Sequence, residues 1–110
     1  MIIGSTLFKL DGTEYYSPSF PHGGLGATFL CDVTHLEGSP TVTITVEHRT
    51  EEETSFTSLA VFTSITTVGL KTLDAGSIKE VVRFKYEFDA GDAATDAIHF
   101  AMMAPSWRPY

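Results

Sequence analysis

The sequence predicts an all-β fold: a single-domain antiparallel β-sandwich of the jelly-roll or Greek-key type, with seven or eight strands. Three observations support this prediction. Apolar and polar residues alternate with the two-residue period of a strand, no segment has the period of an amphipathic helix, and turn-forming Gly, Pro and Asp separate the alternating segments at roughly even spacing. A chain of 110 residues has the usual size of one domain, so residues 1–110 are predicted to form it. A strongly bent small barrel is the alternative architecture.

The first predicted element is a β-hairpin. Residues 7–10 and 13–16 flank the dipeptide Asp11-Gly12, which supplies the positive φ that a two-residue type I′ turn requires. Residues 17–26, SPSFPHGGLG, follow as a predicted loop. Two prolines lack the N–H group that a sheet needs, and three glycines weaken any strand there.

Two central strands are predicted at residues 27–36 and 41–49, joined by a turn at 37–40. The second strand carries threonines on its other face, as expected of a β-branched polar residue that faces water. One face of each strand is mostly apolar, and these faces consist of Ala27, Phe29, Cys31 and Val33 in the first strand and Val42, Ile44, Val46 and His48 in the second.

The next region, rich in Phe, Val, Ile and Thr, predicts two short strands at about 56–62 and 64–68, with a bend near Thr63 and Ser64. Residues 69–77 are predicted to form a loop. Residues 78–88 give the clearest alternation in the chain. Its apolar face consists of Val82, Phe84, Tyr86 and Phe88.

The C-terminal part predicts a loop at residues 89–95, a last strand at 97–103 and a tail at 104–110. The last strand alternates through Ile98, Phe100 and Met102. The prolines of the tail predict that it does not continue a sheet regularly.

Composition argues against several classes of partner. The net charge is −7, and the chain has only seven Lys and Arg residues. Binding to nucleic-acid phosphates needs clustered cations, and anionic membrane surfaces attract them as well. We therefore expect neither a nucleic-acid nor a membrane partner. The first residues, MIIGSTLFKL, lack the basic and apolar regions of a signal peptide, so the expected location is the cytoplasm or a virion.

No motif indicates catalysis or a cofactor. Cys31 is the single cysteine, so neither an intrachain disulfide nor a C-x-x-C motif is available. Its place between Phe29 and Val33 on an apolar face predicts a buried thiol with a raised pKa. No G-x-S-x-G elbow occurs, and the glycines at 23–26 do not precede a helix that could bind phosphate. The sequence therefore predicts no catalytic residue, no cofactor and no enzyme.

The segment EHRTEEET, residues 47–54, looks like a site in the linear sequence. In a strand, Glu47 and Arg49 share one face, where they can pair, whereas His48 points to the opposite face. Metal ligands must converge, and these side chains diverge. The segment is predicted to be a strand end followed by a solvent-exposed acidic loop.

Other metal sites stay open as alternatives. His35 and His48 could lie on adjacent strands and bind zinc, and Asp89, Asp92 and Asp96 have oxygen ligands at short loop spacing that suit calcium. A small cupin-like metal-dependent protein would need converging His and Glu side chains. We expect no metal.

The loop at 17–26 and the C-terminal tail predict contacts with a partner or with the domain itself. Prolines limit the unfolded freedom of both segments, so docking them costs less entropy. Aromatic residues and Arg are the usual anchors of protein interfaces. The predicted interface residues are Phe20, Trp107, Arg108 and Tyr110. Alternatively, Tyr15, Tyr16, Phe20 and Trp107 could form the platform of a carbohydrate-binding β-sandwich module.

Three segments carry a family resemblance: EHRTEEETSFTSL (47–59), VVRFKYEF (81–88) and IHFAMMAPSW (98–107). From about residue 27 onward, this short β-rich chain resembles the small all-β proteins that decorate tailed-phage heads or serve as their auxiliary structural subunits. The resemblance implies a non-enzymatic structural protein of the virion. It also implies a closed homo-oligomer such as a trimer, docked on the major capsid protein or another particle protein.

Overall fold

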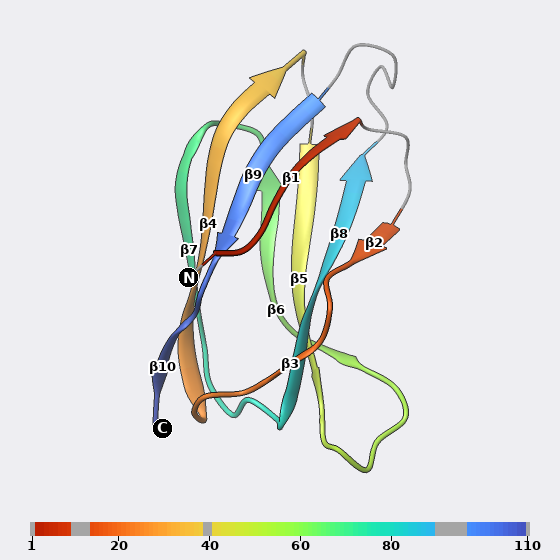
Figure 1. Ribbon diagram of the computed structural model, residues 1–110, viewed down its shortest axis with the longest axis vertical. Helices are drawn as coiled ribbons and strands as arrows, with labels where there is room; N and C mark the ends of the chain where they lie inside the picture. Colours follow the sequence, from red (N-terminus) through yellow and green to blue (C-terminus); the bar gives the residue numbers. More distant parts are fainter. Residues whose placement is uncertain (1, 10–13, 39–40, 90–96, 110) are drawn as a thin grey trace.

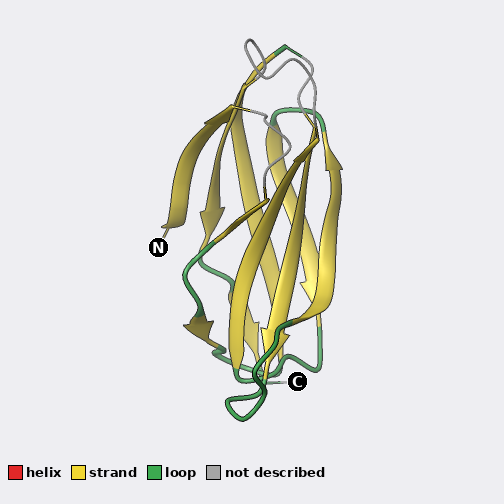
Figure 2. Ribbon diagram, turned by 90° about the vertical axis from the view of Figure 1, so that its right-hand side faces the viewer, coloured by secondary structure: helices red, strands yellow, loops and turns green. Residues whose placement is uncertain are grey.

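The computed structural model describes residues 2–9, 14–38, 41–89 and 97–109, with the backbone alone described at 2–9, 63–64, 88–89 and 97. These residues form two antiparallel β-sheets packed face to face, and they include no helix (Figures 1 and 2). The described part of the chain therefore has no helix long and apolar enough to cross a membrane. The strands are β1 (Ile2–Lys9), β2 (Glu14–Tyr16), β3 (Phe20–Pro21), β4 (Gly26–Glu37), β5 (Thr41–Arg49), β6 (Thr57–Ile65), β7 (Gly69–Ala75), β8 (Val81–Asp89), β9 (Ala97–Met103) and β10 (Ser106–Arg108).

The strand order is that of a jelly roll. The first sheet, sheet A, runs β1-β9-β4-β7, and β10 continues along the edge of β4 that β9 occupies. The second sheet, sheet B, runs β2-β8-β5-β6, and β3 lies with β2 along one edge of β8. The ten strand segments thus fill eight positions, four in each sheet, which is the count of a jelly roll. The predicted sandwich of this type is confirmed.

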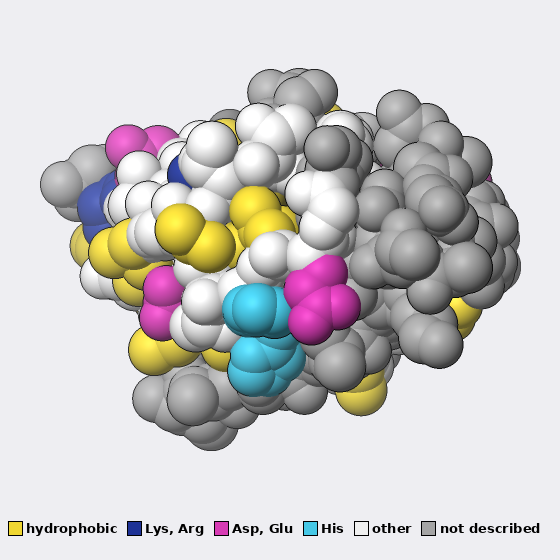
Figure 3. Space-filling model, turned by 90° about the horizontal axis from the view of Figure 1, so that it is seen from above, with side chains coloured by type: hydrophobic (Ala, Val, Ile, Leu, Met, Phe, Trp, Pro, Cys, Tyr) yellow, Lys and Arg dark blue, Asp and Glu magenta, His cyan; other side chains and the backbone are white. Residues whose placement is uncertain are grey.

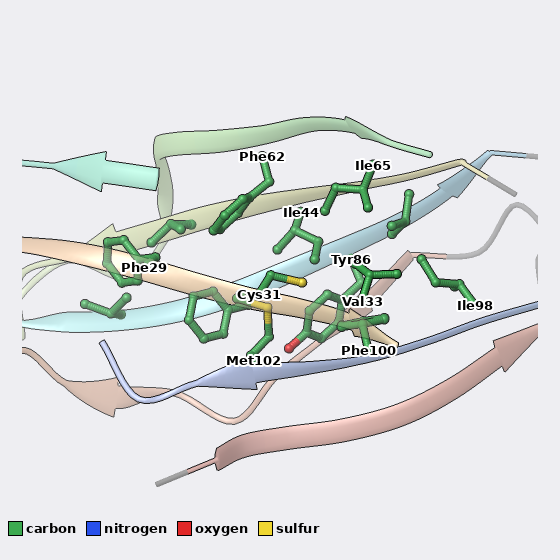
Figure 4. Close-up of a cluster of buried hydrophobic side chains, with 14 of the residues drawn as sticks. Phe29, Cys31, Val33, Ile44, Phe62, Ile65, Tyr86, Ile98, Phe100 and Met102 are labelled. Carbon is green, nitrogen blue, oxygen red and sulfur yellow. The ribbon is translucent and has the colours of Figure 1, made fainter. Parts of the chain in front are cut away.

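The core lies between the sheets because the inner strands alternate as predicted. Ring edges meet across the two sheets, with the Phe29 and Phe84 centroids 5.9 Å apart and nearly perpendicular. Burying each large apolar side chain stabilises the fold by about 1.5–3 kcal/mol. Figure 4 shows part of this core, and its buried members are Ala27, Phe29, Cys31, Val33, Val42, Ile44, Val46, Phe62, Ile65, Ile78, Val82, Phe84, Tyr86, Ile98, Phe100 and Met102.

The predicted N-terminal hairpin is wrong. β1 pairs with β9 in sheet A, whereas β2 pairs with β8 in sheet B, so the two segments belong to different sheets. An isolated two-stranded hairpin is marginally stable, and each segment instead pairs with an inner strand of a larger sheet. Asp11 and Gly12, the predicted turn, lie outside the described residues.

The region from 56 to 77 also differs from the prediction. A single strand, β6, replaces the two predicted short strands, and the expected bend at residues 63–64 is a β-bulge opposite Thr43. The predicted loop at 69–77 contains β7, which pairs with β4 over seven positions without a register shift. Its mixed polar residues, such as Lys71 and Asp74, hid the strand pattern.

The predicted loop at 17–26 contains a split edge strand. Ser17 N donates a hydrogen bond to Phe84 O at 2.9 Å, and Phe84 N donates to Ser17 Oγ at 2.8 Å. The hydroxyl takes the place of a main-chain acceptor directly before Pro18, after which β3 resumes the pairing with β8. Proline thus interrupts this edge without ending it.

Candidate functional site

The segment at the end of β5 divides between two faces, as predicted. His48 is buried, with 8% of its surface exposed, whereas Glu47 and Arg49 lie on the outer face of sheet B. Glu47 and Arg49 do not pair with each other, although the sequence suggested that they could. Glu47 Oε1 accepts a hydrogen bond from Arg83 Nε of β8 at 2.8 Å, because Glu47 and Arg83 are cross-strand neighbours.

Arg49 closes the loop that follows its own strand. Its Nη1 donates to the carbonyl oxygens of Thr50 and Glu53, each at 3.0 Å. Thr50 N in turn donates to Glu53 Oε1 at 2.8 Å. The acidic loop is therefore a folded cap, and its glutamates do not converge on a common centre.

A cluster of aromatic and arginine side chains lies on the outer face of sheet B. The guanidinium carbon of Arg83 is 4.2 Å from the ring centroid of Tyr16 and 4.1 Å from that of Phe56. Arg49 lies over the Phe56 ring at 5.1 Å. Each such cation–π contact contributes about 0.5–1 kcal/mol when exposed. We call Tyr16, Arg49, Phe56 and Arg83 the aromatic–arginine cluster.

This cluster combines residues from β2, β5, β8 and the loop before β6. Tyr16 is 48% exposed, while the side chain of Arg83 is 27% exposed and that of Glu47 only 13%. The cluster is thus partly exposed at the surface, and its central cation, Arg83, is paired with the carboxylate of Glu47. Sequence reasoning missed it. The only signal was that Arg83 and Glu47 each lie on the polar face of a predicted strand.

The predicted interface residues that the structure describes contact their own domain. The Phe20 ring lies 5.5 Å from that of Phe84, and the Trp107 ring lies 6.2 Å from that of Phe29 in an edge contact. Arg108 Nη1 donates to Thr28 Oγ1 at 2.9 Å. These contacts lie within the domain, so an interface role for the three residues stays a prediction. The fourth residue, Tyr110, lies outside the described residues.

The tail is more regular than predicted, because residues 106–108 form β10. β10 pairs with the first residues of β4, one residue out of step with the pairing of β9. Two glycines make room for it. A Cβ on Gly23 would come within 2.5 Å of the Trp107 ring, and a Cβ on Gly24 would overlap the backbone oxygen of Arg108. The loop at 17–26 and the tail, both predicted as contact segments, therefore pack on each other.

The four candidates for a sugar platform do not share a surface. Tyr15 and Phe20 pack against the core from β2 and β3, and Trp107 belongs to β10 in sheet A. Tyr16 is the exposed member, and one face of its ring is covered by Arg83.

His35 and His48, the two histidines suggested as zinc ligands, do not lie close together. β4 and β5 run in opposite directions, so His35 and His48, near their C-terminal ends, lie at opposite ends of the sandwich (Figure 1). His35 is instead the cross-strand partner of His99. Figure 3 shows two histidine side chains together beside an acidic group, and His35 Nε2 lies 3.2 Å from Glu37 Oε1. In the described parts of the chain, no three His, Cys, Asp or Glu side chains form a group that could hold a metal ion.

The remaining candidate residues fall into two groups. Cys31 is fully buried, as predicted, and burial raises the pKa of its thiol to about 12, with a further increase from the charge of Asp32. Asp92 and Asp96, two of the three calcium candidates, lie outside the described residues, and the third, Asp89, ends β8.

A groove lies at the edge of the sandwich where β6 and β7 part. Its volume is about 450 Å³. Val68 and Leu70 are more than half exposed nearby, and residues 54–70 include no charged side chain. The groove is lined by Val61, Phe62, Ile65, Thr66, Thr67, Leu70, Lys71, Thr72 and Leu73.

No protein-family model, curated protein or solved structure matches this chain. Its function therefore has to be inferred from the fold and from the surfaces described above.

Proposed function

We propose that this chain is a non-enzymatic structural protein that self-associates and docks on a larger particle through the aromatic–arginine cluster. The observation that carries the proposal is a group of Tyr, Phe and Arg side chains fixed on the outer face of sheet B. Tyr and Arg are enriched among the residues that contribute most to protein binding.

The cluster is held in place by contacts within the domain. Glu47 fixes the Nε of Arg83, and the loop carbonyls fix the guanidinium of Arg49. Immobilising a long side chain on binding costs about 0.5–1.5 kcal/mol. Because these two arginines are already held, a partner that contacts Tyr16 and Arg83 loses less of that free energy.

The finer proposal is a capsid decoration or auxiliary assembly subunit of a virion. Jelly rolls serve as viral capsid domains, lectins and cupins, so the fold by itself does not choose among them. The resemblance of residues 47–59, 81–88 and 98–107 to phage decoration proteins favours the first. The core also favours it, since the described buried side chains are apolar apart from Thr45 and His48. The proposed partners are further copies of this chain, in a closed oligomer such as a trimer, and a major capsid protein.

The finer proposal is tested with the neighbouring reading frames. A portal, protease or major capsid gene beside this one would supply the partner, and particles assembled from that capsid protein can be sedimented with this chain. We expect the chain to sediment with the particles, and we expect Tyr16→Ala to weaken this binding about tenfold, as loss of one interface anchor does.

The matched control is His35→Ala, which removes another exposed ring, near the end of β4 in sheet A. It should bind like the unmodified chain. Equal binding by all three proteins would exclude the cluster as the docking surface, and failure of the unmodified chain to bind would contradict the capsid role.

A further inference from the structure

Residues 78–80 hold two loops at one end of the sandwich. Ile78 N donates to Leu25 O at 3.0 Å, and Glu80 Oε1 accepts from Glu51 N at 3.2 Å. Lys79 Nζ contacts Glu53 Oε1 at 3.0 Å. We call residues 78–80 the latch, because they hold the loop before β4 and the acidic loop after β5 against the same end of the sandwich.

The latch closes on a buried histidine. Lys79 N donates a hydrogen bond to His48 Nδ1 at 3.2 Å. A ring nitrogen that accepts a hydrogen bond carries no proton, so His48 is neutral while the latch is closed. His48 sits at the end of β5, directly before Arg49 and the acidic loop.

Protonation of His48 would work against this arrangement. Nδ1 would become a donor facing the N–H donor of Lys79, and the hydrogen bond between them would be lost. A positive charge would also appear in a buried position near the ammonium group of Lys79. Both effects favour moving the latch away from the ring.

The acidic loop connects the latch to the aromatic–arginine cluster. Glu53 bonds both Lys79 of the latch and Thr50 of the loop, and Phe56 follows three residues later. Arg49 donates to the loop carbonyls and also lies over the Phe56 ring. Displacing the loop would therefore shift Phe56 and its contact with Arg83.

We propose that His48 is a proton switch: its protonation opens the latch at residues 78–80 and loosens the aromatic–arginine cluster, so that docking is tight at neutral pH and weak in mild acid. The effect on docking rests on the proposed function. The opening of the latch and the loosening of the cluster do not, because both can be measured without a partner.

The charged groups around the ring set the pH window. Burial lowers the pKa of His48 below its ordinary value of 6.5, Lys79 lowers it further, and Glu53 opposes both. The neighbours of His48 on the flanking strands, Thr57 and Val82, carry no charge. His22 Nδ1 donates a hydrogen bond to the carbonyl oxygen of Ile78, and Glu80, itself part of the latch, accepts one from the amide of Glu51.

The sign follows from the direction of the shift. Because the folded protein holds His48 at a lower pKa than the unfolded chain does, the stabilisation is complete above about pH 6.5 and is lost as the pH falls below it. Hydrogen bonds from Thr50 and Lys79 keep the pKa of Glu53 below its ordinary value of 4.5. Glu53 therefore stays ionised while His48 titrates.

The test measures amide hydrogen exchange, corrected for the intrinsic pH dependence, in steps from about pH 7.5 down to about pH 5, so that the range extends well below the ordinary histidine pKa. In the unmodified protein we expect protection of residues 50–56 and 76–80 to fall in acid. His48→Asn keeps an acceptor near the position of Nδ1 but cannot be protonated, so its protection should not fall. His35→Asn, an exposed histidine at the other end, should behave like the unmodified protein.

The NMR signal of Arg83 Nε–H reports the cluster without any partner. We expect it to broaden with the same midpoint as the protonation of the His48 ring, and this comparison holds even if His48→Asn fails to fold. Equal acid sensitivity of His48→Asn and the unmodified protein, or an Arg83 signal unaffected by His48 protonation, would overturn the proposal. If the chain docks at no pH although protonation of His48 still opens the latch, the result would count against the proposed function alone.

Discussion

Single residues take their chemistry from the face of the strand on which they lie. Cys31 faces the core between Phe29 and Val33, so burial raises the pKa of its thiol and leaves it a small apolar side chain. His48 faces the same way from sheet B but meets a backbone donor, Lys79 N. Two residues at equivalent alternating positions thus differ in their chemistry because one finds a polar partner at the end of the sandwich.

Gly24 leaves no room for a side chain. Its hypothetical Cβ overlaps the backbone of Arg108, which cannot move without lifting β10 from β4. We expect Gly24→Ala to lower the free energy of unfolding by about 1–3 kcal/mol, the usual cost of overpacking. Urea unfolding followed by the fluorescence of Trp107 measures this.

Gly76→Ala is the matched control, because a Cβ there meets nothing within 4 Å. It should leave the free energy of unfolding nearly unchanged. Equal losses in the two variants would contradict the close contact between the loop at 17–26 and β10.

At the scale of elements, the inner strands could be predicted more accurately than the edge strands. β5 and β9 have the bounds that alternation predicted, because an inner strand pairs on both sides and buries one whole face. Edge strands carry features that protect them from pairing with other chains: β3 contains Pro21, and β7 carries Lys71. Because of these residues, the sequences of β3 and β7 resemble those of loops.

The candidate site was predictable only in part, for a related reason. Alternation assigned Glu47 and His48 to opposite faces, and the structure confirms this. The pairing of Glu47 with Arg83 depends on the register between β5 and β8, which joins residues 36 positions apart. The positions of Tyr16 and Phe56 depend on how an edge strand and a loop pack, and local pattern does not encode either.

β10 gives a test at this scale. Ending the chain at Ala104 would remove the Trp107 ring from Phe29 and leave that edge of β4 uncovered. Because Trp107 is partly exposed, we expect a loss of about 2–4 kcal/mol in the free energy of unfolding, somewhat below that of truncating a fully buried Trp. Urea unfolding followed by circular dichroism measures it, since the shortened chain has no tryptophan. Unchanged stability would show that the tail does not hold the domain together.

At the scale of the whole molecule, the chain is an acidic jelly roll, and we propose that it assembles with other proteins. A net charge of −7 makes copies of the chain repel one another except where charge is sparse or neutralised. The aromatic–arginine cluster meets that condition, since it contains no carboxylate and its central cation, Arg83, is neutralised by Glu47. The uncharged stretch at 54–70 borders the same sheet through β6. A closed oligomer would bury such surfaces in its interfaces and leave the acidic remainder of the protein surface in solvent.

The central claim, that this chain is an assembly subunit, is tested most directly by sedimentation velocity of the full chain over a wide range of concentrations. We expect the sedimentation coefficient to rise with concentration to the plateau of one closed oligomer, and Tyr16→Ala to require a higher concentration to reach it. A chain that sediments as a monomer at every concentration, with Tyr16→Ala indistinguishable from it, would contradict the claim.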